Sequence, residues 1–231
     1  EYFESDIVKV HLAGSAIIGT ALGPYSPGSA YVLLHHYMGE VDGTVGAWGY
    51  ARGGMGSITK AMASSFKANN GEIIAGSPVT KILIKNNKSY GLVLENGDEI
   101  YANKIVSNLD VKRTFLKIVE EENLPGDFYK AVKNFKIRGS SGKLNIALDG
   151  MPTFPALPEN SEFIGHADMH FIDSMERMER AYDDWKDGTW SKDPYIDCTI
   201  PSATDPTMVP PGKLFMSCFV QYCPAQIEGR A

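Results

Sequence analysis

Apolar residues recur at helical spacing in two stretches of the chain. Met55, Ile58, Met62 and Phe66 fall on one face of a helix, and the run from Met175 to Trp185 repeats apolar residues at intervals of three and four. A glycine follows each run within a few residues, which is typical of a helix end. The pattern therefore predicts two amphipathic helices, each with one face packed against a core.

β-Branched and alternating runs predict strands in two groups. In the first group, Glu72 to Ala75 is followed by Val79 to Lys85, Tyr90 to Glu95 and Glu99 to Val106, with Asn96-Gly97 as a tight turn. The second group contains Lys143 to Leu148, Tyr195 to Ile200 and Leu214 to Val220. We expect two separate sheets, with the helix at 55–66 on the first and the helix at 173–187 beside the second. The predicted fold class is therefore α+β.

The composition is that of an ordinary globular protein and argues against several partners. Of the 231 residues, 43% are hydrophobic and 22% are charged, and the formal net charge is −6. Because there is no basic field, nucleic acid and anionic membrane are not expected partners. No apolar run approaches the roughly 20 residues of a transmembrane segment, and the acidic start shows no signal peptide.

The cysteines indicate a reducing compartment. The chain has an odd number of cysteines, without metal-binding spacing: Cys198, Cys218 and Cys223. We therefore expect free thiols in a reducing compartment, the cytoplasm or an organelle matrix. Four residues separate Cys218 from Cys223, as in a redox pair, but the two lie on a predicted strand and loop. We interpret that spacing as chance.

The stretch from Arg52 to Asp110 carries the most specific pattern. Gly-Gly-Met-Gly begins a helix at Gly53, a strand follows at Ser77-Pro78-Val79, and a hairpin closes on Ile105-Val106-Ser107-Asn108. This order resembles the middle of the FAD-binding domain in the phytoene desaturase and amine oxidase superfamily of flavoproteins. Other tracts resemble the phytoene dehydrogenase-related branch of that superfamily, namely Tyr31 to His36, Gly46 to Tyr50 and Ile200 to Thr207.

The resemblance implies FAD as the cofactor and assigns three binding residues. The main chain of Val79 would hold the adenine, because Pro78 has no N–H and a strand residue can offer one donor and one acceptor to a base. Gly53 and Gly54 match the motif at which the chain returns from the substrate domain towards the flavin. A purely steric role at a crowded crossover explains these glycines equally well.

The resemblance also implies a domain organisation and a function. Residues 1–50 and 111–231 would form the substrate-binding domain, and residues 51–110 an interleaved piece of the FAD-binding domain. The fingerprint Gly-x-Gly-x-x-Gly is absent from the chain, so we expect an internal piece of a longer protein whose N- and C-terminal parts are its partners. The implied reaction is hydride transfer from a small apolar substrate to flavin, and no residue here receives a catalytic role. The alternative is a non-catalytic binding or scaffold protein that keeps the desaturase-like shell.

Histidines and aromatic residues allow further hypotheses. His166 and His170 are four apart, but on a strand-like run they stand too far apart to share a metal, and no metal site is expected. His35-His36 are interpreted as strand neighbours with opposite faces, for which structural hydrogen bonding is favoured over acid–base chemistry. The aromatic concentration before the Gly-Gly-Met motif suits either a substrate cavity or a plain core; it comprises Tyr31, Tyr37, Trp48 and Tyr50.

Overall fold

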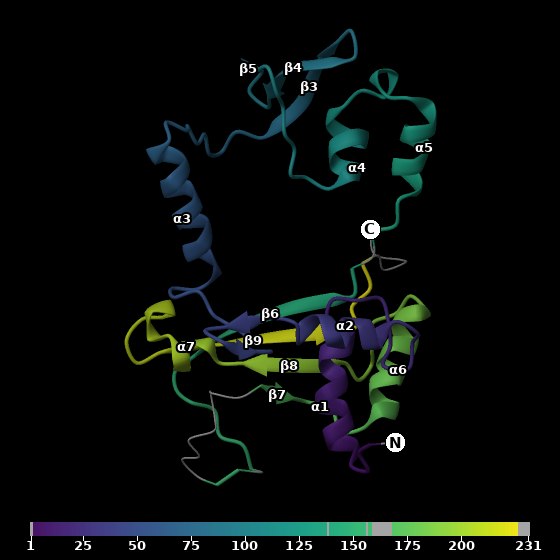
Figure 1. The fold of residues 1–231 in the computed structure, drawn as a ribbon, viewed down its shortest axis with the longest axis vertical. Helices are drawn as coiled ribbons and strands as arrows, with labels where there is room; N and C mark the ends of the chain where they lie inside the picture. The colour runs from purple at the N-terminus through teal and green to yellow at the C-terminus, as the bar shows by residue number, and fades with distance from the viewer. Residues whose placement is uncertain (1, 138, 156, 159–167, 226–231) are drawn as a thin grey trace. The chain divides into compact units, whose positions relative to one another are not determined.

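The chain forms two compact units, each with its own sheet (Figure 1). The computed structural model describes residues 2–137, 139–155, 157–158 and 168–225. The first unit comprises Glu1–Met62 and Arg138–Ala231, and the second comprises Ala63–Ile137. The mixed helix-and-sheet architecture predicted from the sequence is confirmed.

The first unit is built on a four-stranded antiparallel sheet of order β6-β9-β8-β7. This sheet joins the three distant runs predicted at 143, 195 and 214, and it is separate from the sheet of the second unit, as expected. The elements of this unit are α1 (Asp6–Ile17), α2 (Ser29–His36), β1 (Glu40–Val41), β2 (Thr44–Val45), the first part of α3 (Met55–Ala68), β6 (Ser141–Leu148), β7 (Met169–His170), α6 (Met175–Lys186), β8 (Tyr195–Thr199), α7 (Pro201–Thr204), η3 (Pro206–Met208) and β9 (Leu214–Gln221).

Helix α6 buries the apolar stripe that its sequence predicts. Met178 and Ala181 join a core with Val10 and Ile17 of α1 and with Tyr195 at the start of β8. Met178 is completely buried, as are Ile17 and Tyr195. The hydroxyl of Ser174 caps the helix by accepting the N–H of Arg177 at 3.3 Å. Figure 1 shows α1 and α6 beside each other at one end of the sheet.

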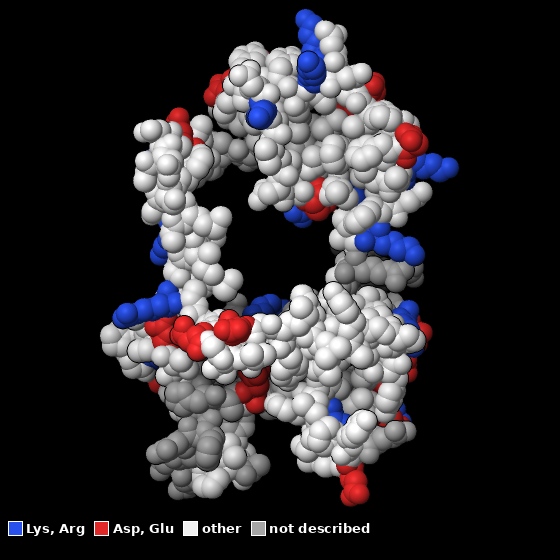
Figure 2. All heavy atoms as spheres, viewed as in Figure 1, with Lys and Arg blue, Asp and Glu red and all other residues white. Residues whose placement is uncertain are grey.

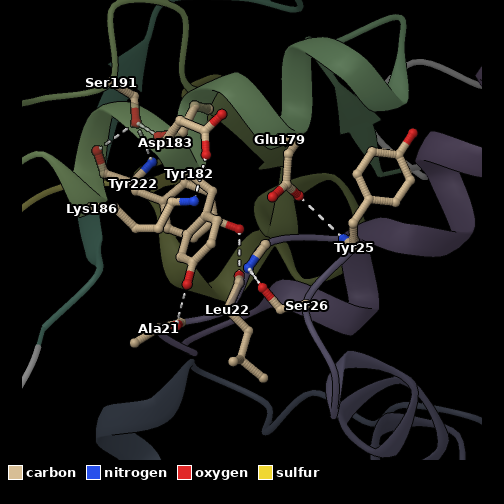
Figure 3. Close-up of polar contacts among 12 residues, drawn as sticks. Ala21, Leu22, Tyr25, Ser26, Glu179, Tyr182, Asp183, Lys186, Ser191 and Tyr222 are labelled. Atoms are coloured by element: carbon tan, nitrogen blue, oxygen red, sulfur yellow. Dashed lines mark hydrogen bonds and ion pairs between the residues drawn. The ribbon is translucent and has the colours of Figure 1, made fainter.

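Polar contacts from buried aromatic residues fasten this core to the loop after α1 (Figure 3). The Tyr222 hydroxyl donates to the Leu22 carbonyl at 2.6 Å, and the Tyr182 hydroxyl donates to the Ala21 carbonyl at 3.3 Å. Ser191 donates to the carbonyl of Tyr222 and accepts its N–H. The two hydroxyl groups satisfy backbone carbonyls of the loop and so attach it to the core.

The sheet of the first unit has two chemically different faces. One face is apolar and packs on α7, with Cys198, Ile200, Met216 and Cys218 as its buried residues. Cys198 and Cys218 are register partners on β8 and β9, so their side chains lie on this same face. The residues that alternate with these cysteines along β8 and β9 must then lie on the other face, and several of them are polar.

The second unit is a three-stranded antiparallel sheet with short helices beside it. Asn86 and Asn87 form the two-residue turn between the first two strands, and both have left-handed backbones, with φ of 52° and 59°. Its elements are the rest of α3, β3 (Val79–Lys85), β4 (Lys88–Leu94), β5 (Glu99–Tyr101), α4 (Val111–Arg113), the π-helix η1 (Thr114–Ile118), the 3₁₀ helix η2 (Glu121–Asn123) and α5 (Gly126–Asn134).

Three sequence expectations about this region are wrong. Residues 72–75 have no strand partner among the described residues, and the strand predicted over 99–106 ends at Tyr101, after which Ala102 makes a last bond to the Tyr90 carbonyl at 3.0 Å. The apolar stripe of α3 is exposed and not packed in a core: Met55 is 76% exposed and Met62 67% exposed. A strand or an apolar stripe needs a partner, and the local sequence does not supply one.

The compact units divide the chain at Ile137, within the segment after residue 110 that the sequence assigns to the substrate-binding domain. Residues 111–134, which form α4, η1, η2 and α5, belong to the same unit as β3 to β5, and the division falls at Ile137. Phe115 of η1 and Phe128 of α5 stack edge to face at 4.9 Å within this unit. The short helices therefore pack within the second unit, which we also call the hairpin unit.

The described residues contain no helix that is both long enough and apolar enough to cross a bilayer. On the face shown in Figure 2, the Lys and Arg side chains of the described residues are scattered among Asp and Glu and form no continuous basic area. The charge distribution agrees with the acidic composition.

Candidate functional site

Val79 lies at the start of β3, where its backbone faces an open edge. The Glu95 N–H donates to the Pro78 carbonyl at 2.9 Å, and Val79 is the register partner of Leu94. Since the Pro78 carbonyl points to β4, the N–H and the carbonyl of Val79 must point away from β4. In the described sheet β3 has a neighbour on one side only, so these two groups face the unoccupied edge.

Gly53 and Gly54 lie in the first unit, in a turn just before α3. Both have positive φ, 80° and 82°, which only glycine adopts without strain. The Gly53 N–H donates to the Asp205 carboxylate at 2.6 Å, and a side chain at Gly54 would press on the Met208 methyl group. The backbone conformation therefore favours glycine at both positions, and only Gly54 also has a close side-chain neighbour. The bond from Thr207, followed by the one from Gly53, lowers the pKa of Asp205.

The polar face of the first sheet carries a cavity of about 400 Å³, which we call the sheet cavity. Its floor includes a row of register partners that crosses all four strands: His170 of β7, Asp197 of β8, Phe219 of β9 and Lys143 of β6. Partners across an antiparallel sheet have their side chains on one face, so the strand register alone brings these four residues together.

The pair of His170 and Asp197 is held in an unusual electrostatic state. His170 Nε2 lies 3.8 Å from Asp197 Oδ2, and both side chains are largely buried. Burial, and then the neighbouring His11, lower the pKa of His170. Burial, and then Asp168, raise the pKa of Asp197 to about 6. Both shifts oppose an ion pair, so near pH 7 the imidazole is neutral beside a poorly solvated carboxylate.

Two buried polar atoms at this cavity have no hydrogen-bond partner among the described residues, namely His170 Nδ1 and the Tyr195 hydroxyl. Tyr195 is completely buried, and a Cβ at Gly14 of α1 would collide with its hydroxyl. The rings of His170 and Tyr195 meet edge to face at 5.4 Å, and His11 lies 5.0 Å from His170. Unpaired buried polar groups are rare and costly, which marks the cluster as a candidate for ligand contact.

Aromatic residues form part of the wall of the sheet cavity. Tyr37, Trp48 and Tyr50 line it, which supports the cavity interpretation over the core interpretation for these three, while the exposed Tyr31 stacks on His35 instead. The His36 ring stacks on the Trp48 ring of this wall, with 5.6 Å between the ring centroids.

The strand interpretation of His35 and His36 is wrong, because both lie on α2. His36 Nδ1 bonds to the Val32 carbonyl at 2.8 Å, one helical turn earlier, and this contact agrees with the structural role that the sequence favoured. Neither histidine lines the sheet cavity.

The structure brings no metal-type cluster together among the residues it describes. His166 lies outside the described residues, and His170 has Asp197 and His11 as its neighbours. The three cysteines are free thiols in this structure, and all three are buried. Burial, and then a hydrogen bond with Cys218, raise the pKa of Cys198 to about 12, which opposes thiolate chemistry there.

A second cavity, of about 720 Å³, lies within the second unit. Ile82, Phe115 and Leu124 supply apolar walls, and Ser107 and Thr114 add hydroxyl groups that bond to each other at 2.9 Å. Val79 does not line this cavity, so the structure keeps the predicted adenine contact apart from it.

Sequence reasoning missed most of the charged residues at the sheet cavity. Asp197 and Lys143 lie at alternate positions of predicted strands whose other positions are apolar, and this alternation was the available signal. Their meeting depends on the pairing of β6, β8 and β9, which the sequence pattern does not specify.

One unit has a helix-flanked antiparallel sheet with a mixed aromatic and polar cavity, and the other has a three-stranded sheet with an open edge. Both are compatible with a flavoprotein fold, and sequence comparison identifies the class. Residues 5–187 match the family described as flavin containing amine oxidoreductase, so the chain belongs to that family. The prediction of a desaturase- and amine oxidase-like flavoprotein is confirmed.

Two relatives show where in the family the similarity lies. A mouse (Mus musculus) protein named pyridine nucleotide-disulfide oxidoreductase domain-containing protein 2 is 36% identical over 233 residues, covering 98% of this chain. Prolycopene isomerase 2, chloroplastic, of an Oncidium hybrid cultivar is 31% identical over 209 residues, covering 88% of this chain. The chain spans 40% of the length of the first protein and 31% of the second.

The fold is shared with a solved structure. An oxidoreductase from Methanosarcina mazei aligns with a TM-score of 0.61 over 95% of this chain and 47% of its own, at 20% identity. At that identity the similarity shows the fold alone.

Proposed function

We propose that the gene product containing this chain is an FAD-dependent oxidoreductase. In this proposal the open edge at Val79 binds the adenine of FAD, and the sheet cavity binds the substrate. The observation that carries it is the direction of the Val79 backbone: a donor and an acceptor on one residue face an unpaired edge in a chain of a flavin-binding family. Bound flavin would accept a hydride from the substrate.

The residues present fit one part of such a cofactor. Adenine offers an amino donor beside a ring acceptor, and the Val79 carbonyl and N–H are the complementary pair. The anionic pyrophosphate is usually bound at a helix N-terminus by the fingerprint that this chain lacks. The chain's own contribution to the cofactor is therefore small, at one or two neutral hydrogen bonds.

The domain roles follow as part of the proposal. In this proposal residues 51–110 belong to the FAD-binding domain, and residues 1–50 and 111–231, which include the four-stranded sheet, belong to the substrate-binding domain. Gly53 and Gly54 would form the turn between the two, held by Asp205. The aromatic wall of Tyr37, Trp48 and Tyr50 supports a small, largely apolar substrate.

A non-catalytic binding protein that keeps this shell is the alternative. The apolar and aromatic cavity would serve such a protein equally well. The two functions differ in one measurable property, because only the oxidoreductase requires a tightly held flavin.

The test is the flavin content of the purified gene product and of two variants at Val79. Val79→Pro removes an N–H that faces the open edge, so it deletes a flavin contact without removing a bond to β4. We expect Val79→Pro to lower flavin occupancy several-fold and the matched Val79→Ala to change it little. Equal losses in both variants would show that side-chain packing matters there instead. A colourless wild-type protein would favour the binding protein.

The isolated 231-residue chain gives a second test. Each neutral hydrogen bond contributes about 0.5–1.5 kcal/mol net, which is too little against the entropy of association. We therefore expect FAD titrated into the isolated chain to bind weakly, and calorimetry that gave submicromolar affinity would contradict this account of the site.

A further inference from the structure

The sheet cavity has four polar side chains on its floor and wall, which is too many for a cavity that only holds a hydrocarbon. Lys143 and the Tyr195 hydroxyl are donors, Asp197 is an acceptor, and a neutral His170 can be either. Residues on the covered face of a sheet are usually apolar, as they are on the opposite face of this same sheet. Four such residues around one space therefore require a function.

We propose that the sheet cavity binds a molecule with an apolar body and a hydroxyl end group, and that His170 and Asp197 contact the hydroxyl. This inference rests on the proposed function for the location of the substrate, and it adds the chemistry of the end group. The aromatic wall contacts the body, and the cross-strand row contacts the oxygen.

The mixture of donors and acceptors selects a hydroxyl over other end groups. A hydroxyl both donates and accepts, so it pairs with an acceptor such as Asp197 and a donor such as Lys143 at once. A carboxylate end group would face Asp168 and Asp197, which line the cavity and repel a negative charge. An ether accepts but cannot donate, which leaves the poorly solvated Asp197 without a new partner.

The geometry of His170 agrees with this role. Its Nε2 faces Asp197, and its Nδ1 is one of the two buried polar atoms without a partner among the described residues. The Tyr195 hydroxyl is the other, and both residues border Gly14 of α1. A small polar group that reached this position would satisfy atoms that the protein itself leaves unpaired.

The test uses a series of ligands with one tail and different end groups. Octan-1-ol, 1-methoxyoctane, octylamine and octanoate are titrated into the gene product by calorimetry. We expect octan-1-ol to bind at least about five-fold more tightly than the ether, since only the alcohol donates a hydrogen bond. Tighter binding of the ammonium or the carboxylate, or equal binding of alcohol and ether, overturns the proposal.

Variants locate the end-group contact. Asp197→Asn and His170→Gln should each weaken the binding of octan-1-ol several-fold and leave the affinity for 1-methoxyoctane unchanged. Asp149→Asn is the matched control, because Asp149 is an exposed carboxylate that pairs with Lys213 away from the cavity. Loss of discrimination in the control, or its retention in both cavity variants, contradicts the assigned contacts.

A measurement on the wild-type protein covers the case in which a variant does not fold. The imidazole resonances of His170, assigned by their absence in His170→Gln or by selective labelling, should shift with octan-1-ol and not with the ether. Flavin content is measured on the same samples. Retained flavin without end-group preference refutes only this inference, whereas alcohol preference in a flavin-free protein refutes only the proposed oxidoreductase.

Discussion

Helices α6 and α3 have similar sequence patterns and opposite environments. Each places apolar residues at intervals of three and four on one face. On α6 this face is the core of the first unit, and Met178 is completely buried. On α3 the face is exposed, and Met62 is 67% exposed. Amphipathic periodicity thus determines that a helix forms and which face is apolar, but the partner comes from the rest of the fold.

The largest expected effect compares these two helices directly. Met178→Ala should lower the unfolding free energy of the first unit by about 2–5 kcal/mol, because it leaves a cavity in a closed core. Met62→Ala, the matched change on α3, should change it by less than about 0.5 kcal/mol. Chemical denaturation of the purified chain measures both. Similar losses in the two variants would mean that the stripe of α3 is packed in solution.

The second prediction concerns Asp197 on the polar face of the first sheet. The raised pKa of Asp197, about 6, means that the folded state binds this proton more tightly than the unfolded state. Stability therefore falls as the pH rises from about 4 to about 6. Asp197→Asn removes the ionisable group, so it should be more stable than the wild type by roughly 1–3 kcal/mol at pH 7. That advantage should vanish near pH 4.

Denaturation of wild type and Asp197→Asn across this pH range checks the prediction. A pH-independent difference would indicate a packing effect of the amide and not the ionisation of Asp197. A variant that gains stability while it loses affinity for octan-1-ol would show that Asp197 serves binding at a cost to the stability of the fold.

The smallest expected effect concerns the second unit. Asn87 has φ of 59°, so Asn87→Ala should destabilise the hairpin by about 1 kcal/mol, and Asn87→Gly should leave it unchanged or slightly more stable. Hydrogen exchange of the amides between residues 79 and 101 measures this locally. Loss of protection in the first unit as well would show that the two units unfold together.

Local rules on the sequence determined most of the elements. The strand at Val79–Lys85 was predicted with the observed bounds, and the helix beginning at Met55 was predicted correctly. Asp110 caps its helix by accepting the Arg113 N–H at 2.9 Å, a contact between residues three apart. These features depend on contacts within a few residues, namely caps, turns and side-chain periodicity, which a sequence displays directly.

Only the tertiary structure decided which elements have partners and what the cavity contains. Residues 72–75 have strand-like sequence but no hydrogen-bonded neighbour in the described chain, because an isolated strand cannot satisfy its backbone. His170, Asp197 and Lys143 meet because the register of four strands distant in sequence aligns them. Pairing register depends on the packing of both sheet faces, so neither the polar row nor the raised pKa of Asp197 can be read from the residues one by one.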